Sequence, residues 1–266
     1  MITINGLVIK ENKVGESSKS IVVLCEDLGI INIFMRGGAK SKKNSSATQI
    51  FSYSKLCIDS KVKANGQSEY YLNSSEPKNI FYNIRLDPLK MSLACYFSEL
   101  LCFSRIEDEH LGDVLKLTLN TLYFLNNDDI NRELLKSIFE FRLLCEMGFR
   151  PYLVGCNKCF KYEDTIMHYN YKSGLLECDE CCYNPDSIYD IQLDKALLYI
   201  VRYIALSDFN KLFSFKINDK YQKKLTEFTE RFIKYNFKEH INTLDFYRGM
   251  EESYEYGYTL SDFGTT

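Results

Sequence analysis

Four cysteines at regular spacing are the residues of this sequence best suited to chemistry. Cys156 and Cys159 form one CxxC pair, Cys178 and Cys181 form a second, and eighteen residues separate the two pairs. This spacing is typical of a four-thiolate zinc site. Four thiolates complete the tetrahedral shell that Zn²⁺ prefers, and they leave no position for a substrate. The sequence therefore predicts a structural Zn²⁺ ion in a zinc knuckle over residues 151–185.

The chain has ten cysteines, and this leaves alternatives open. The two pairs would also allow two disulfides, and either Cys182 or His168 is near enough in sequence to replace a ligand. We expect Cys181 in the shell and His168 as a solvated loop residue. Five single cysteines have apolar neighbours, as buried free thiols do: Cys25, Cys57, Cys95, Cys102 and Cys145. With no recognisable secretory signal, these thiols predict a reducing cytoplasm.

Positive charge is concentrated in the N-terminal part of the chain. The net charge is −3, but the first eighty residues carry +4 and the remainder −7. Seven basic residues lie between positions 36 and 63, where Asp59 is the single acid: Arg36, Lys40, Lys42, Lys43, Lys55, Lys61 and Lys63. A local basic surface of this kind attracts polyanions even on an acidic protein.

The elements that would position these basic residues are strands. Short β-branched or aromatic runs occur at 7–9, 20–24, 30–34, 51–58 and 70–72, with Gly, Asn and Asp turn signals between them. Five strands in about eighty residues predict a small barrel of the OB-fold type, whose face and loops commonly hold single-stranded nucleic acid. The basic, apolar-poor segment 36–48 separates the third and fourth strands and is suited to phosphate binding. Phe34, Phe51 and Tyr53 are nearby rings for which core packing is favoured over base stacking.

Helical spacing of apolar residues replaces the strand pattern from residue 87 onward. Asp87 is a candidate N-cap before Pro88, and helices are predicted over 89–103, 111–125, 134–147, 191–206 and 221–237. The sequence thus predicts an α+β protein with an OB-fold domain over 1–80, a helical domain over 81–250 that contains the zinc knuckle, and an acidic tail over 251–266.

Two classes of protein fit this sequence poorly. No apolar run approaches the ~20 residues that a membrane helix needs, so a soluble protein is expected. The three histidines lie in no metal-hydrolase motif, and no GxSxG or GxGxxG fingerprint is present. We therefore expect that the protein is not an enzyme.

The order of these features resembles the RecO family of DNA repair proteins over essentially the whole chain. The resemblance is carried by Arg36–Lys40 in the barrel, Phe141–Pro151 in the helical part, Ser173–Cys178 before the second cysteine pair and Tyr235–Ile241 near the end. Each piece alone is weakly specific for the family, whereas the order in which the pieces occur is strongly specific.

The resemblance implies a bacterial, nucleoid-associated recombination mediator. Such a protein binds single- and double-stranded DNA, anneals complementary strands and, with RecR, helps to load RecA onto strands coated by single-strand-binding protein. By motif the DNA contacts carry over to Arg36 and Lys40, and by position to Lys42 and Lys43; we add Lys55, Lys61 and Lys63 from charge alone. The zinc assignment carries over to the four cysteines.

A protein-interaction adaptor without direct DNA binding is the alternative. In that hypothesis the zinc knuckle and the acidic helical part bind protein partners, and the basic segment is merely solvated. Strand annealing by the purified protein distinguishes the two hypotheses.

Overall fold

The computed structural model describes residues 1–14, 18–35, 46–183, 188 and 190–255. The chain packs as two compact units. The first comprises Met1–Asn127 together with the chain from Ile241 onward, and the second comprises Asp128–His240. The second unit is therefore inserted in the sequence between two parts of the first.

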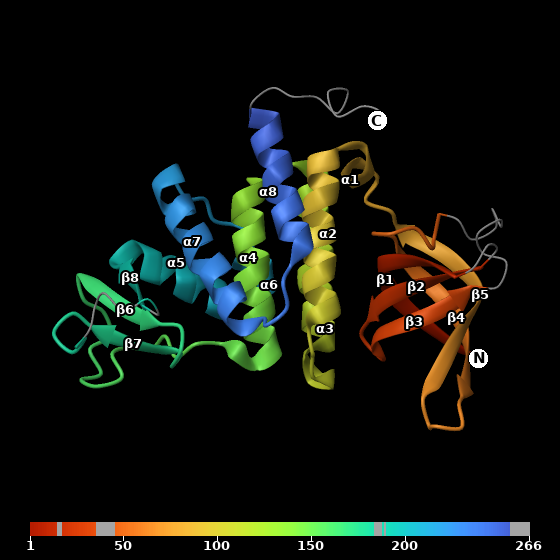
Figure 1. Cartoon of the computed structure of the whole chain (residues 1–266), viewed down its shortest axis with the longest axis horizontal. Coiled ribbons are helices and arrows are strands. Elements are labelled where there is room, and N and C mark those ends of the chain that lie inside the picture. The colour runs from red at the N-terminus through yellow and green to blue at the C-terminus, as the bar shows by residue number, and fades with distance from the viewer. Residues whose placement is uncertain (15–17, 36–45, 184–187, 189, 256–266) are drawn as a thin grey trace. The chain divides into compact units, whose positions relative to one another are not determined.

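A closed five-stranded barrel forms the beginning of the first unit (Figure 1). Its strands are β1 (Ile2–Val14), β2 (Ser18–Cys25), β3 (Gly29–Met35), β4 (Tyr53–Val62) and β5 (Ser68–Asn79). Neighbouring strands follow the order β1-β2-β3-β5-β4, and β1 pairs with β4 to close the ring. Strands β3 and β5 run parallel, and the other pairs are antiparallel. The predicted OB-fold barrel and the α+β class are confirmed.

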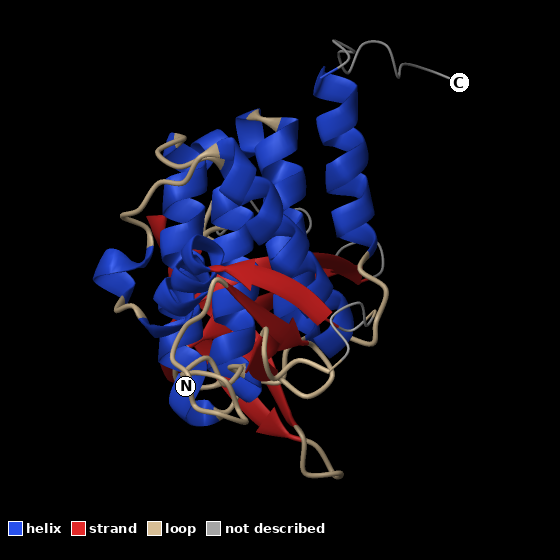
Figure 2. Cartoon of the chain, turned by 90° about the vertical axis from the view of Figure 1, so that its left-hand side faces the viewer, coloured by secondary structure: helices blue, strands red, loops and turns tan. Residues whose placement is uncertain are grey.

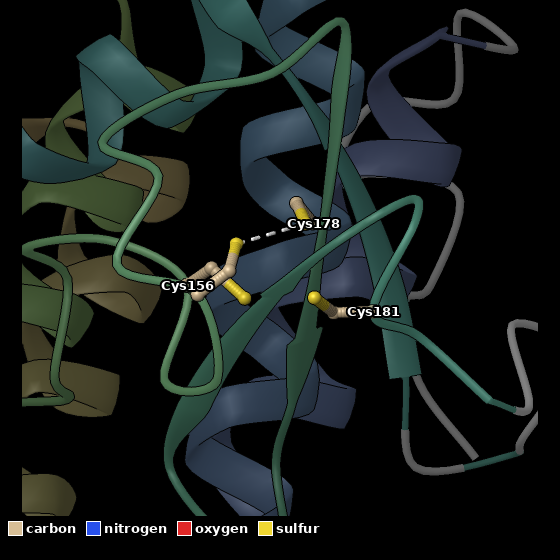
Figure 3. Close-up of side chains that lie close together, drawn as sticks. Cys156, Cys178 and Cys181 are labelled. Atoms are coloured by element: carbon tan, nitrogen blue, oxygen red, sulfur yellow. Dashed lines mark hydrogen bonds between the residues drawn. The ribbon is translucent and has the colours of Figure 1, made fainter.

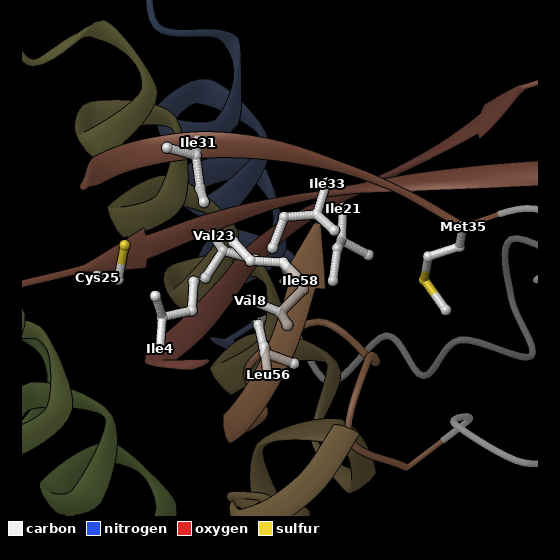
Figure 4. Close-up of a cluster of buried hydrophobic side chains, with 10 residues drawn as sticks. All are labelled: Ile4, Val8, Ile21, Val23, Cys25, Ile31, Ile33, Met35, Leu56 and Ile58. Carbon is white, nitrogen blue, oxygen red and sulfur yellow. The ribbon is translucent and has the colours of Figure 1, made fainter. Parts of the chain in front are cut away.

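Alternating apolar residues of four strands fill the barrel (Figure 4). The buried cluster comprises Ile4, Val8, Ile21, Val23, Cys25, Ile31, Ile33, Met35, Leu56 and Ile58. Gly6 allows β1 and β2 to approach closely, since a Cβ atom there would lie 2.3 Å from Val23 Cγ1. Gly66 supplies the positive φ of the β4–β5 hairpin, at 81°.

The segment between β3 and β4 is described from Ser46 onward, and hydrogen bonds hold it on the barrel. Ser52 Oγ donates to Ser46 O at 2.8 Å, and Ser54 Oγ donates to Ala47 O at 2.8 Å. Phe51 has φ of 60° and is buried, so the fourth strand begins at Tyr53, two residues later than expected. A left-handed residue cannot continue a pleated strand.

Four helices and a 3₁₀ turn complete the first unit among the described residues. They are α1 (Tyr82–Leu86), α2 (Pro88–Phe103), η1 (Asp108–His110), α3 (Leu111–Asn127) and α8 (Asn242–Glu255). Asp87 caps α2 as expected, accepting the N–H of Leu89 at 2.8 Å. Helix α8 packs beside α2, where Glu99 accepts the N–H of Thr243 at 2.9 Å (Figure 1).

The second unit combines helices with a small antiparallel sheet. Its elements are α4 (Arg132–Leu144), η2 (Cys145–Phe149), β6 (Ile166–Asn170), β7 (Leu175–Cys178), β8 (Asp190–Asp194), α5 (Lys195–Leu206), α6 (Phe209–Leu212) and α7 (Asp219–Asn236). The sheet order is β7-β6-β8. The inner side chains of β6 meet α7, where the ring of Tyr169 lies 5.5 Å from that of Phe228, and the sheet lies against the helices (Figure 2).

Two further sequence-based expectations about elements differ from the structure. The helix predicted over 191–206 begins at Lys195, because residues 190–194 pair with β6 as strand β8 and Asp194 caps the helix. Helix α8 was not predicted, and it extends through Glu255 into the segment expected to be a tail. The domain boundaries at residues 80 and 250 were drawn from element type rather than from packing, and they stay a prediction.

Candidate metal centre and nucleic-acid interface

The four predicted cysteine ligands converge in the second unit (Figure 3). The sulfur atoms of Cys156, Cys159, Cys178 and Cys181 all lie within 4.8 Å of one another, and those of Cys159 and Cys178 are 3.6 Å apart. A tetrahedral Zn²⁺ with bonds of about 2.3 Å requires sulfur separations of roughly 3.8 Å. The donor set and its spacing therefore fit a closed thiolate site for zinc.

Two tight turns and one strand position the sulfur atoms. Cys178 ends β7, and the N–H groups of Cys181 and Cys182 return to its carbonyl at 3.0 and 2.9 Å. In the first turn, Phe160 N donates to Cys156 O at 2.9 Å, and Cys156 N donates to Lys161 O at 2.9 Å. Each CxxC turn thus brings its own two thiols together, and a backbone bridge between Cys156 and Leu176 of β7 brings the two turns together.

The thiols differ in acidity because their surroundings differ. Burial raises the pKa of Cys178, and hydrogen bonds with Cys178 and Cys159 raise the pKa of Cys181 to about 12. Burial would also raise the pKa of Cys156, but hydrogen bonds from the backbone of Cys159, Cys178 and Lys158 outweigh it and lower that pKa to about 6. Neighbouring thiolates repel one another, so a bound cation is needed to hold all four in the charged form.

The two alternative ligands lie outside this group of four sulfur atoms. We expected His168 to be a solvated loop residue, and this prediction is wrong. His168 lies in β6, is only 2% exposed, and its Nε2 is 3.0 Å from Asp179 Oδ1. Strand pairing with β7 and β8 buries it, a long-range effect that local sequence does not carry. Cys182 follows the second pair and is half-buried.

The single cysteines are less uniformly buried than expected. Cys25 and Cys145 are buried, as predicted for free thiols, but Cys57 and Cys95 are only half-buried and Cys102 is exposed. Cys102 belongs to the last turn of α2, where the helix end leaves it uncovered. Apolar sequence neighbours therefore did not predict burial at this position.

Arg202 of α5 anchors the first cysteine turn to the helical part of the second unit. Its guanidinium donates to Leu153 O at 2.8 Å and to Tyr162 O at 2.6 Å, and it lies 4.0 Å from the centre of the Tyr162 ring. Arg202 is buried, so these bonds are made away from water. The turn is consequently held at both of its ends.

The predicted phosphate-binding residues fall into two groups. Arg36, Lys40, Lys42 and Lys43 lie outside the described residues. Lys55 and Lys61 are exposed on β4, where Leu56 and Ile58 between them point into the core, and Lys63 follows the strand directly. The described lysines therefore project from the outside of the barrel.

Lys61 and Lys63 have defined neighbours on the barrel. Lys61 Nζ lies 5.5 Å from the centre of the Tyr71 ring, and that ring lies 5.9 Å from Phe34 on β3. Lys63 Nζ is 2.8 Å from Glu69, whose hydrogen bond raises the pKa of Lys63. A lysine beside paired rings is suited to bind a phosphate while a base stacks on a ring. The charge of Lys63, in contrast, is partly balanced by Glu69.

The rings suggested by the sequence have different surroundings. Phe51 is buried, in agreement with core packing, whereas Tyr53 is half-buried and Lys78 Nζ lies 5.6 Å from its ring centre. Tyr71 was missed as a partner of Phe34. Strands β3 and β5 pair so that Phe34 lies opposite Tyr71. This pairing of distant strands is not visible in a single sequence.

Comparison with known families agrees with these observations. A family model described as Recombination protein O N terminal matches residues 1–81, and one described as Recombination protein O C terminal matches residues 85–245. The chain belongs to the RecO family. Among similar proteins, the DNA repair protein RecO of Acetivibrio thermocellus is 27% identical, with 93% of this chain and 96% of the relative covered.

Two further relatives extend the comparison. The DNA repair protein RecO of Alkaliphilus metalliredigens is 28% identical over 88% of this chain and 92% of its own length. That of Caldicellulosiruptor bescii is also 28% identical, over 94% of this chain and 99% of its own length. This RecO-family chain is therefore matched along almost all of its length by DNA repair proteins. Within the described residues, no helix has both the length and the apolar character needed to cross a membrane.

Proposed function

We propose that this RecO-family chain is a recombination mediator. In this proposal it binds single- and double-stranded DNA through its barrel, anneals complementary strands and, with RecR, helps to load RecA onto strands coated by single-strand-binding protein. The observation that carries the DNA-binding part is the presence of the exposed Lys55 and Lys61 and the half-buried Phe34–Tyr71 ring pair on an OB-fold barrel. The protein partners follow from the family.

Annealing follows from charge neutralisation. Two DNA strands repel each other through their phosphates, and lysines that neutralise phosphates allow the strands to approach. Phosphate contacts carry no sequence information and leave the base edges free to pair. We assign this role to Lys55 and Lys61, and to Arg36, Lys40, Lys42 and Lys43 of the adjoining segment. Lys63 would take part by replacing its ion pair with Glu69 by a phosphate contact. No chemical step is assigned to the protein.

The Zn²⁺ ion is proposed as a structural cofactor held by Cys156, Cys159, Cys178 and Cys181. When bound, it would join the first cysteine turn to the end of β7 and the turn that follows it. The protein's own part is to hold the four sulfur atoms at metal-binding distance and to secure the first turn through Arg202. The ion would have no open position for catalysis.

The DNA-binding proposal is tested by anisotropy of a labelled single strand across a salt series. Wild type is compared with a Lys40/Lys42/Lys43→Ala variant and with a Lys55/Lys61→Ala variant. For each phosphate that a variant no longer neutralises, the slope of log affinity against log salt should fall by about 0.7. The expected result is weaker, less salt-sensitive binding by both variants.

The matched control is Lys223/Lys234→Ala, which removes two exposed lysines from α7 in the second unit. This control should bind DNA as wild type does. If the control variant loses as much DNA affinity as the two barrel variants, then net charge and not the barrel accounts for binding. If wild type fails to bind even at low salt, the adaptor hypothesis replaces the mediator proposal.

A further inference from the structure

Phe160 has a backbone conformation and an exposure that do not suit its side chain. It follows Cys159 directly, its φ is 62°, and it is 77% exposed. A bulky residue with positive φ is a genuine outlier, since its Cβ crowds the neighbouring backbone. Glycine adopts this conformation at little cost, and the chain uses glycine in this way at Gly66, Gly148 and Gly174.

The first cysteine turn imposes this conformation. Phe160 N donates to Cys156 O, and Cys156 N donates to Lys161 O, both at 2.9 Å, so the backbone of residue 160 is fixed from both sides. Gly155 lies directly beneath it, because a Cβ atom there would be 3.3 Å from Phe160 O. The turn therefore calls for glycine at position 160, and the chain has phenylalanine instead.

Two other phenylalanines with positive φ show what normally offsets this strain. Phe51 has φ of 60° and Phe81 has φ of 45°, and they are 1% and 5% exposed. Burial of each ring compensates for its backbone conformation. Phe160 gains no such compensation from the residues that the structure describes. Strained residues cluster at active sites, ligand clamps and switch regions, so a strained and exposed ring points to a role in binding.

Other exposed apolar side chains belong to the same turn. Val154 is 62% exposed and Tyr162 is 61% exposed. Arg202 donates to the carbonyls of both residues, at 3.2 and 2.6 Å, so their backbones are fixed close together. These side chains flank the cysteine turn, and Arg202 holds the chain on both sides of it. Aromatic side chains such as those of Phe160 and Tyr162 are enriched in protein interfaces.

The charges around the turn argue against a nucleic-acid partner. Lys158 lies 3.1 Å from Glu177, and Lys161 lies 2.9 Å from Asp164 and 3.3 Å from Glu180. Both lysines are thus balanced by carboxylates. A Zn²⁺ ion with four thiolates would add a net charge of about −2, which would repel phosphates and attract basic groups.

We propose that Phe160 is the anchor of a protein–protein interface on the zinc knuckle, inserting its ring into an apolar pocket that Lys or Arg side chains surround on the partner. The proposal rests on the proposed function, because it places a partner contact of the mediator on the knuckle and leaves DNA to the barrel. Phe160→Gly is the decisive variant. It removes the ring while relieving the left-handed strain, so the knuckle should keep its zinc and its thermal midpoint should be unchanged or higher.

The probes are purified RecR and RecA, each titrated separately against labelled full-length protein with zinc bound. Phe160→Gly is expected to weaken binding of one of them at least tenfold, and Phe160→Tyr should restore it because the ring is kept. Glu180→Lys should also weaken this binding, since it opposes a basic surface. Phe246→Ala is the matched control, as it removes an exposed phenylalanine from α8 in the first unit.

Each outcome decides the proposal. Unchanged binding of both proteins by Phe160→Gly overturns it while the mediator function stands. Loss of single-stranded DNA binding in that variant also overturns it, because the ring would then be a nucleic-acid contact. If wild type binds neither RecR nor RecA, the partner part of the proposed function fails and the inference fails with it.

Discussion

Gly155 allows the first cysteine turn to close. A Cβ atom at this position would lie 2.8 Å from Lys161 O, the carbonyl that accepts the N–H of Cys156. Gly155→Ala should therefore push these backbones apart and misplace the Cys156 thiol, although all four cysteines remain. We expect one zinc per wild-type chain and about 10–100-fold weaker zinc affinity in the variant, measured by chelator competition.

Gly249→Ala is the control for this glycine. Nothing lies within 4 Å of a Cβ atom placed there, and the residue belongs to α8. The variant should keep wild-type zinc affinity and gain up to about 1 kcal/mol of stability from helix propensity. Equal zinc affinity in Gly155→Ala and wild type would show that the first turn does not position Cys156.

Single residues were predictable where the signal is local. The four cysteines are recognisable because two turns of fixed spacing each present two thiols, and the structure brings all four together. His168 and Tyr71 were not predictable in the same way. His168 is buried by strands paired on both sides of β6, and Tyr71 meets Phe34 through a pairing of β3 with β5. Both depend on contacts between distant parts of the chain.

At the scale of elements, a buried ion network joins α4 to α7. Lys136 Nζ lies 2.8 Å from Glu140 and 2.7 Å from Glu230, and the side chains of Lys136 and Glu140 are fully buried. Thr229 of α7 also donates to Glu140, at 2.6 Å. Lys136→Met would remove the ammonium group that lies against the buried Glu140 carboxylate. We expect a loss of about 3–5 kcal/mol from the free energy of unfolding of the second unit, measured by urea denaturation.

Lys223→Met provides the comparison, because Lys223 is an exposed residue of α7. Its effect should stay within about 0.5 kcal/mol. Adding Glu140→Gln to Lys136→Met should recover part of the loss, since the amide is uncharged and still accepts the Thr229 hydrogen bond. If Lys136→Met and Lys223→Met unfold at the same urea concentration, the network contributes no stability.

Elements were predictable in type more often than in extent. The barrel strands follow from β-branched runs between turn residues, and α2 follows from its Asp87–Pro88 start. The sequence predicts that residues 191–194 form the first turn of a helix, because their apolar residues continue the periodicity of α5. Pairing with β6 decides their conformation as strand β8, and Asp194 ends the strand by capping the helix.

At the scale of the whole molecule, α8 completes the first unit although a separate unit precedes it in the sequence. Tyr247 is fully buried, whereas the adjacent Phe246 is 61% exposed. Tyr247→Ala should destabilise the first unit by about 3 kcal/mol, since it removes a buried ring, and Phe246→Ala should have little effect. Hydrogen exchange is the suitable measurement, because a chain of two units need not unfold in one step. Amides of α2 should exchange faster in Tyr247→Ala, and those of α4 should not.

The return of α8 to α2 also sets an order of events on the ribosome. Glu99 and Thr243 are in contact but 144 residues apart in the sequence. At about 5–20 residues per second, roughly 7–30 s of synthesis separate them. The barrel strands are complete long before that, whereas α2 waits through the synthesis of the entire inserted unit for the helix that covers it. At that stage the nascent chain carries the barrel and a helix α2 whose surface toward α8 is still exposed, so this is the stage at which binding by a chaperone is most useful.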